Sequence, residues 1–506
     1  MLIIIIMITV IIIINIYIKL KKESFMNYLN ISKVSFKKVP LGSILACSLT
    51  FALSSSLYAA GHKNGYGPFP VTVKGYSGSA TNSVSYGGQI ARHLLHNNLK
   101  KLASGGNPND PTNAPMKKMI VNFSGKDAGR KILSPTSKDK FPIKQKMVDE
   151  LSKKKNLSGK TYQGVMPAWP GNMTGVQVLN HMIKKAGKTS GGVDTRNGYN
   201  YPQLISKFAM GAVFYNQACD NYLDEKLNAD TKPNNKPYKK GAAYTGKEHV
   251  WDEAFGYWGA AAHTMSLSAK DSYNVAKGKS LKAADHNKDG MVDLASEMTY
   301  AHAYYASSFD KGGKTNYLKT VTGAFIDGRK LITSANGNKL SESQIIQLKS
   351  YAGEICDNWE AVIAESVFKY AGSVYGDIEK IEKGMASGSS IDKALSNYIK
   401  HWGELKGFAM ALQAGKENLG QTATKLNRMM GFGPLMPNLS QVVGVDSSGN
   451  FIKDQGSSFG YYKLHMIKIQ KLMVEAFGVT ARSKDKMSGL ASLSKSLGTK
   501  KSAEND

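Results

Sequence analysis

The sequence lacks the motifs that identify most nucleophilic and phosphate-binding enzymes. It has no G-x-S-x-G nucleophile elbow, no setting typical of a reactive cysteine and no glycine-rich phosphate loop. It also lacks the H-E-x-x-H zinc-peptidase signature, because "HVWDE" at residues 249–253 has no second histidine at the required position. We find no repeat of fixed period, which argues against a repeat architecture. These absences favour a binding or accessory function over catalysis.

Acidic residues are few compared with basic ones. The chain has 38 Asp and Glu against 66 Lys and Arg, a formal net charge of +28 that falls to about +23 when the six Lys and one Glu of the first 59 residues are removed. The lysines are spread along the chain instead of forming one block, and Ile, Asn and Tyr are also abundant, so AT-rich coding explains the composition better than a nucleic-acid groove. We therefore expect no nucleic-acid partner, while attraction to anionic lipid or polysaccharide stays open.

Cysteine is rare, with three in the whole chain. Cys47 lies in "ILAC", which resembles a lipoprotein cleavage box, but the apolar run continues to Leu57, so we expect no lipid anchor there. Cys219 and Cys356 remain. They either form one disulfide in an oxidising compartment or stay buried and free, and the sequence alone leaves both alternatives open.

Two apolar runs lie near the N-terminus. Residues 2–18 are mostly Ile and reach the minimum membrane span of about 17 residues. Residues 26–60 contain a basic start, an apolar run and a small-residue cut site, which are the three parts of a secretory signal peptide. We expect Met26 to be the true start and residues 1–25 an upstream mis-start, with a two-span membrane anchor as the alternative. Both interpretations put residues 61–506 outside the cytoplasm, in the periplasm or cell envelope.

Apolar residues at spacings of three and four dominate the rest of the chain and predict helices. Ser341 and Gln344 form a capping-box pattern at the start of one such helix. The clearest apolar stripes lie at residues 204–222, 345–362 and 402–412. The fold class that these patterns predict is all-α, a large helical bundle or two packed helical lobes, with an EF-hand-like calcium loop.

Other patterns mark the limits of this helical domain. We expect a single domain over residues 61–482, followed by a disordered basic tail at 483–506 that is rich in Ser and Lys. Turn-rich loops are expected at 103–115 and 228–246. Strict alternation is scarce, and "PFPVTVKGYSG" at 68–78 is the best strand candidate.

Residues 285–297, "DHNKDGMVDLASE", carry oxygen-bearing side chains at alternate positions, as an EF-hand calcium loop does. Gly290 stands where such a loop turns sharply, and the closing carboxylate comes one position late. We expect a structural calcium ion that holds a helix at 297–307 in place, whereas a solvated turn rich in Asn, Asp and Gly is the alternative. The predicted ligands are Asp285, Asn287, Asp289, Met291 through its carbonyl, Asp293 and Glu297.

Two pairs of residues at helical spacing offer a second site, for a transition metal. His249 and Glu253 are one turn apart, and His401 and Glu404 are three residues apart. Together they would supply two imidazoles and two carboxylates if their helices are neighbours. The simpler interpretation is an acidic helix start that includes Asp252 and, separately, a satisfied pair at a helix edge.

Four blocks resemble, in the same order, the bacterial exported proteins grouped as domain of unknown function 4856: "GYSGSATNSVSYGGQIAR", "EHVWDEAFGYWG", "DHNKDGMVDLASE" and "HWGELKGFAMALQ". The resemblance extends from about residue 66 to about residue 477. It implies a helical envelope protein, often a lipoprotein, associated with imelysin-like proteins and outer-membrane receptors of the iron-uptake type, and it implies no established activity. Imelysins carry G-x-H-x-x-E, with a glutamate three positions after the histidine. Here the residue three positions after His249 is Asp252, and this departure argues against an imelysin-type metal site.

Two functions are therefore compared. The first is a non-enzymatic periplasmic binding or accessory protein in metal or nutrient acquisition, with an outer-membrane receptor or an imelysin-like protein as partner. The second is a metal-dependent hydrolase that uses a carboxylate of the His249 and His401 pairs as general base. Convergence of His249 and His401 within about 5 Å would favour the hydrolase, and placement on separate faces would remove its candidate site.

Overall fold

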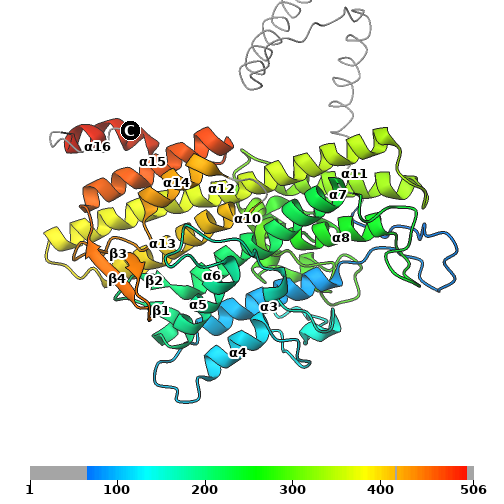
Figure 1. Ribbon diagram of the computed structural model, residues 1–506, viewed down its shortest axis with the longest axis horizontal. Coiled ribbons are helices and arrows are strands. Elements are labelled where there is room, and N and C mark those ends of the chain that lie inside the picture. The colour runs from blue at the N-terminus through cyan, green and yellow to red at the C-terminus, as the bar shows by residue number, and fades with distance from the viewer. Residues whose placement is uncertain (1–64, 229, 416–418, 499–506) are drawn as a thin grey trace, which may run out of the picture. The chain divides into compact units, whose positions relative to one another are not determined.

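The computed structural model describes residues 65–228, 230–415 and 419–498, which belong to one compact unit (Figure 1). The expected membrane segment, the signal peptide and Cys47 lie outside the described residues. Among the described helices, none combines the length and the apolar character needed to cross a bilayer.

Helices make up most of the described chain, which confirms the all-α prediction. The first half contains α3 (Gly87–Ala103), α4 (Ala114–Phe123), α5 (Gly175–Gly187), α6 (Tyr201–Ala209), η5 (Met210–Glu225), α7 (Lys226–Asn228) and α8 (Gly246–Trp258). The second half contains α9 (Ala269–Ala276), α10 (Ala301–Asp310), α11 (Tyr317–Ser334), α12 (Glu342–Ala386), α13 (Asp392–Gln413), α14 (Gly420–Met430), α15 (Phe459–Phe477) and α16 (Leu490–Leu497). Single-turn helices lie at Val148–Glu150, Ser158–Lys160, Ser190–Gly192, Thr264–Ser266, Leu281–Ala283 and Met487–Gly489.

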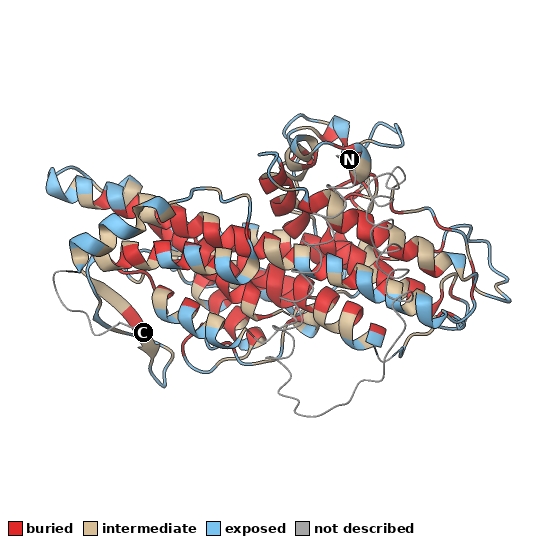
Figure 2. Ribbon diagram, turned by 90° about the horizontal axis from the view of Figure 1, so that it is seen from above, coloured by how far each residue is buried: buried red, intermediate tan, exposed pale blue. Residues whose placement is uncertain are grey.

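The central element is α12, whose 45 residues give it a length of about 68 Å at the usual helical rise. Its predicted capping box is confirmed, since the Gln344 amide donates to Ser341 Oγ at 3.2 Å and the Ser341 amide donates to Gln344 Oε1 at 2.9 Å. Helices α11, α13 and α15 pack along it, and α6 packs against α13. The three predicted apolar stripes lie on α12, on α13 and on α6 with η5, and from Leu348 on in α12 their apolar residues belong to the core (Figure 2).

Helix η5 continues α6 with π-type hydrogen bonding, a rare form in which each amide bonds five residues back. Cys219 on η5 forms a disulfide with Cys356 on α12, with the two Cα atoms 5.7 Å apart and a sequence separation of 137. This bridge answers the question that the sequence left open. It joins η5 to α12 at a buried position.

Strands are confined to two small antiparallel hairpins in the described chain. Val193–Asp194 (β1) pairs with Tyr199–Asn200 (β2), and Ser440–Val445 (β3) pairs with Phe451–Gln455 (β4). The strand prediction at 68–78 was wrong. Pro68 and Pro70 remove two amide donors there, and the Phe69 amide donates to the side chain of Asn82 instead of to a neighbouring strand.

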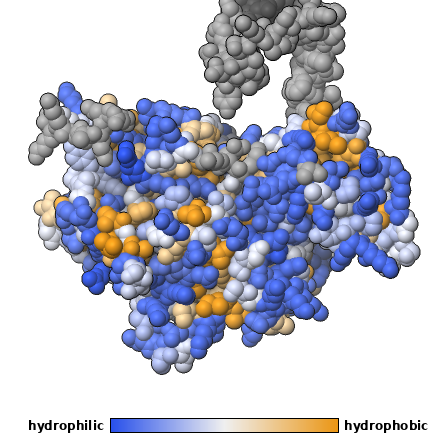
Figure 3. All heavy atoms as spheres, viewed as in Figure 1, coloured by the Kyte–Doolittle hydropathy of each residue, from blue (hydrophilic) through white to orange (hydrophobic). Residues whose placement is uncertain are grey.

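One further difference concerns the C-terminal part of the fold. Residues 490–497, which we expected to be disordered, form α16 and pack on α15. The surface seen in Figure 3 is mostly hydrophilic and carries separate hydrophobic patches. Such scattered patches are ordinary on the surface of a folded protein.

Candidate functional site

The loop at residues 285–297 has the turn geometry that a calcium loop needs. Gly290 has a φ of +84°, a left-handed conformation that glycine adopts without strain. The two carboxylate oxygens of Asp285 accept the amides of Asp289 and Gly290, each at 3.1 Å, so the chain folds around this side chain. Val292, which is fully buried, fastens the loop to a neighbouring segment: its amide donates to the Pro142 carbonyl at 2.9 Å.

The later carboxylates of the loop have two different environments. Glu297 is buried and closes the loop, because Oε1 accepts the His286 amide at 2.9 Å and Oε2 accepts the Asp293 amide at 2.8 Å. Asp293 faces another segment, where it accepts hydrogen bonds from Lys144 at 3.1 Å and Gln145 at 2.8 Å. Burial would raise the pKa of Asp293, but the Ala295 amide, which donates to it at 2.8 Å, together with Gln145 and Lys144 holds that pKa below its ordinary value.

The helix that follows the loop differs from the prediction. It begins at Ala301, not at 297. The residues before Ala301 bond instead to the end of α8 and the segment after it: the Ala262 amide donates to the Ser296 carbonyl and the Tyr300 amide donates to the Gly259 carbonyl, both at 2.7 Å. Asp293 and Glu297 therefore lie on an isolated turn before α10. The loop carries carboxylate, amide and carbonyl oxygens, the ligand types that a hard cation such as calcium prefers.

The proposed transition-metal set is divided between two places. His249 on α8 lies 3.8 Å from Glu253 and stacks on the Tyr244 ring at 4.5 Å. His401 on α13 donates instead to Asp377 of α12 at 2.5 Å, and Glu404 accepts a hydrogen bond from Tyr370 at 3.1 Å.

Each helix thus brings its own predicted residues near each other, but the two pairs have separate partners. Across residues 65–228, 230–415 and 419–498, no group of three or more His, Cys, Asp or Glu is placed to hold one metal ion. This holds for the set of His249, Glu253, His401 and Glu404, and also for the carboxylates of the 285–297 loop in their present positions. The acidic start of α8 is the interpretation that the geometry favours for Asp252 and its neighbours.

That acidic start is part of a buried ionic network that the sequence did not reveal. Arg329 on α11 donates to Asp252 at 2.9 Å and to Glu248 at 3.0 Å, and all three side chains are fully buried. Arg329 also donates to Ser83 at 2.7 Å, while Tyr66 donates to Asp252 at 2.7 Å. The network is structural, since hydrogen bonds between its buried charged and polar groups join α8, α11 and the segment before α3.

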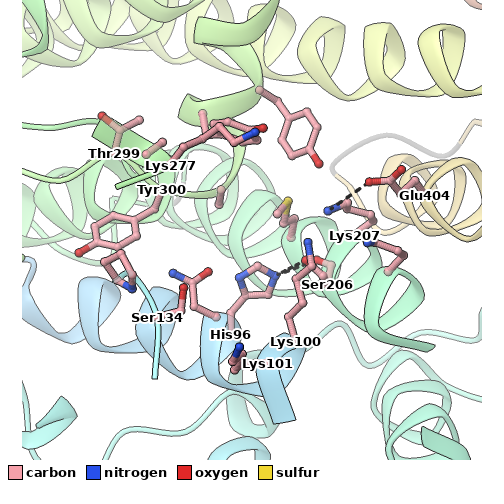
Figure 4. A pocket seen from close by; sticks show the side chains of 18 of the residues that line it. His96, Lys100, Lys101, Ser134, Ser206, Lys207, Lys277, Thr299, Tyr300 and Glu404 are labelled. Carbon is pink, nitrogen blue, oxygen red and sulfur yellow. Dashed lines mark hydrogen bonds and ion pairs between the residues drawn. The ribbon is translucent and has the colours of Figure 1, made fainter. Parts of the chain in front are cut away.

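A cavity of about 840 Å³ lies among α3, α6, α10, α12 and α13 (Figure 4). Of the predicted metal ligands, His401 and Glu404 line it, whereas His249 and Glu253 are not among its lining residues. Eight lysines line it, and Glu404 is the one carboxylate among the described lining residues. The lysines come from segments far apart in sequence: Lys100, Lys101, Lys138, Lys207, Lys277, Lys369, Lys400 and Lys484.

The deepest cation of the cavity is Lys207, which is 2% exposed. Its Nζ lies 4.0 Å from Glu404, and this carboxylate also accepts the Tyr370 hydroxyl. Burial lowers the pKa of Lys207 well below its ordinary value, and repulsion from Lys100 lowers it further. Burial also lowers the pKa of Lys100. The cavity therefore holds eight amines against one carboxylate, and burial disfavours the charged form of the inner amines.

A serine and a histidine also face each other at the cavity, without forming a catalytic pair. His96 Nε2 lies 2.8 Å from the Ser206 carbonyl and 3.3 Å from Ser206 Oγ. Burial lowers the pKa of His96 to about 4, so the ring is neutral and its Nε2 must carry the proton that the carbonyl accepts. It is then unable to accept a proton from the hydroxyl. The cavity is thus equipped to bind through donors and cations.

Comparison with known proteins gives one match. Neither a search of curated proteins nor a search of solved structures finds a similar protein. One family model matches residues 75–349, more than half of the chain, a span that includes α8 and the 285–297 loop but ends before α13. The resemblance of the first three sequence blocks is confirmed, and the chain belongs to the family described as Domain of unknown function (DUF4856).

Proposed function

We propose that this chain is an exported binding or accessory protein of the cell envelope, and that its ligand occupies the lysine-lined cavity. The observation that carries the proposal is the cavity itself. Its volume of about 840 Å³ falls in the range of small-molecule sites, about 300–1,000 Å³. Its lining combines convergent cations with hydroxyl donors from Tyr, Ser and Thr, which is the composition of a recognition site.

The absence of an assembled catalytic centre among the described residues supports binding over hydrolysis. The His249 and His401 pairs have separate partners, and His96 is turned to a carbonyl. No observation favours the hydrolase, so we do not propose it. A role in metal or nutrient acquisition, with an outer-membrane receptor or imelysin-like partner, rests on the family resemblance and is proposed on that basis alone.

Two features support a location outside the cytoplasm. The first is the disulfide between Cys219 and Cys356, because such bonds persist mainly in oxidising compartments. The second is the signal-peptide pattern at residues 26–60.

We also propose that residues 285–297 bind a structural calcium ion through Asp285, Asn287, Asp289, the Met291 carbonyl and Glu297, with Asp293 bound through water. The site would fasten the loop between the 142–145 segment and the residues that lead into α10. Elemental analysis of the purified protein should find calcium in a fixed ratio to the chain, and a chelator should lower the unfolding temperature. Asp289→Asn, at an exposed position, should abolish both effects, and the exposed Glu475→Gln should leave them intact. An unfolding temperature unchanged by the chelator would exclude the ion.

The binding function is tested by filling the cavity. Ser373 of α12 lines it and is half-buried, so Ser373→Trp should occlude it, whereas Ser343→Trp adds the same ring at an exposed site on the same helix. Small molecules released from the purified protein by denaturation are identified by mass spectrometry. A molecule carried by wild type and by Ser343→Trp, but not by Ser373→Trp, is the expected result. Identical content in all three proteins would contradict the proposal.

A further inference from the structure

The lysines of the cavity form a gradient from the solvent inward. Four are exposed and form what we call the rim: Lys101, Lys138, Lys400 and Lys484. Lys100, Lys277 and Lys369 are half-buried, and Lys207 is buried at the inner end. An anion that entered from solvent would meet a lysine amine at each depth. Surface lysines of a basic protein ordinarily point away from each other into water, so this inward series is specific to the cavity.

The inner lysines act on one another electrostatically, since Lys100 and Lys369 lower the pKa of Lys207 and Lys277 lowers that of Lys100. Burial lowers the pKa of Lys369, as it does for Lys100 and Lys207. Glu404 is the nearest compensating charge, and it is shared between Lys207 and the Tyr370 hydroxyl. Burial of cations without enough counter-charge is costly for a fold, and a bound anion removes that cost.

The remaining lining groups point to the same ligand chemistry. The hydroxyls of Thr299 and Tyr304 and the amide of Asn97 line the cavity beside the lysines, and each can donate a hydrogen bond to an oxyanion. Phosphate and carboxylate groups accept several such bonds at once, and charge-assisted bonds from lysine are about twice as strong as neutral ones. The limited volume selects a small molecule over a polymer chain.

We propose that the cavity binds a small molecule that carries at least two phosphate or carboxylate groups, held by Lys100, Lys207, Lys277 and Lys369 and attracted by the rim lysines. This inference rests on the proposed binding function and names its ligand class. It gives the eight lysines of the cavity a specific role in anion binding. Phosphate and carboxylate groups would be recognised by the same lysines, and the two probes named below distinguish between them.

Isothermal titration calorimetry of the full purified chain, with tripolyphosphate and with citrate as probes, tests the proposal. Binding of either probe supports it, and the tighter of the two identifies phosphate or carboxylate as the preferred group. The Lys277→Gln and Lys369→Gln double variant should bind the tighter of the two probes about tenfold or more weakly than wild type, because two charge-assisted contacts are lost. The control is Lys117→Gln with Lys118→Gln, which removes two exposed charges from α4 outside the cavity and should change the affinity by less than about twofold.

A second readout separates site binding from general attraction to a basic protein. Anion binding beside Lys207 should be accompanied by proton uptake, detected as a dependence of the binding enthalpy on the ionisation enthalpy of the buffer. Equal weakening by both double variants, or no binding of either probe, would overturn the polyanion proposal. A neutral or cationic molecule released from wild type but not from Ser373→Trp would also overturn it, and would leave the proposed binding function intact.

Discussion

Replacing Arg329 with methionine should destabilise the protein by about 3–5 kcal/mol, the usual cost of leaving buried carboxylates without their partner. Arg329 donates to Asp252 at 2.9 Å, to Glu248 at 3.0 Å and to Ser83 at 2.7 Å, and the side chains of the ion pairs are fully buried. Methionine keeps much of the aliphatic volume and removes these three bonds together with a fourth, which Arg329 donates to the Thr333 hydroxyl. Two carboxylates then remain in a region that water does not reach.

The carboxylates keep part of their hydrogen bonding, which sets the upper limit of the effect. Asp252 still accepts the Tyr66 hydroxyl and the Ser85 amide, and Glu248 still accepts the Thr245 amide at 2.8 Å. Burial already raises the pKa of Asp252 in the wild type, although Arg329 opposes this. Loss of Arg329 raises that pKa further, so protonation relieves the unpaired charge at low pH. The deficit should therefore be smaller at about pH 5 than at about pH 8.

Urea unfolding followed by circular dichroism measures the change in the free energy of unfolding. The matched control is Lys471→Met, which breaks an exposed ion pair with Glu475 at 3.5 Å and should cost less than about 1 kcal/mol. The triple variant Arg329→Met, Glu248→Gln, Asp252→Asn should recover part of the loss, because no charge is left unpaired. A deficit for Arg329→Met no larger than that of the control would refute the reasoning.

Three further changes test other parts of the fold. Cys219→Ser with Cys356→Ser should lower the free energy of unfolding by about 2–5 kcal/mol, because the bridge closes a long loop, and unfolding of wild type under reducing conditions should show the same loss. Burial lowers the pKa of His93 to about 3 and that of His96 to about 4. The free energy of unfolding should therefore fall as the pH drops below about 6.5, by up to about 1.4 kcal/mol per pH unit for each ring. Replacing either histidine with Gln should make the free energy of unfolding less dependent on pH in this range. Lys406 is fully buried, and burial lowers its pKa to about 7, so Lys406→Met should stabilise the protein more at about pH 6 than at about pH 10; an equal effect at both values would contradict the assignment.

The parts of the fold that the sequence predicted depend on local periodicity and local capping. The stripe on α12 repeats every three to four residues over several turns, and Ser341 with Gln344 marks its start, so neither needs knowledge of the tertiary structure. The sharp turn at Gly290 was recognisable for the same reason, since the residues of the loop at 285–297 are close in sequence, whereas its calcium ion stays a prediction. The strand prediction at 68–78 failed because alternation over a few residues does not supply a partner strand, and this segment has none.

The network and the cavity could not be predicted because their members are brought together only by helix packing. Arg329 lies 81 residues from Glu248, and each alone resembles an ordinary helix-surface charge. One signal was available at the cavity: Lys207 is a lysine within the apolar segment at 204–222, where a cation has no solvent. A charged residue on an apolar stripe requires a buried partner or a cavity, and here it has both, a carboxylate on α13 and a cavity lined by lysines from other segments. The most informative residues for the function of this chain are therefore those that interrupt its helical pattern.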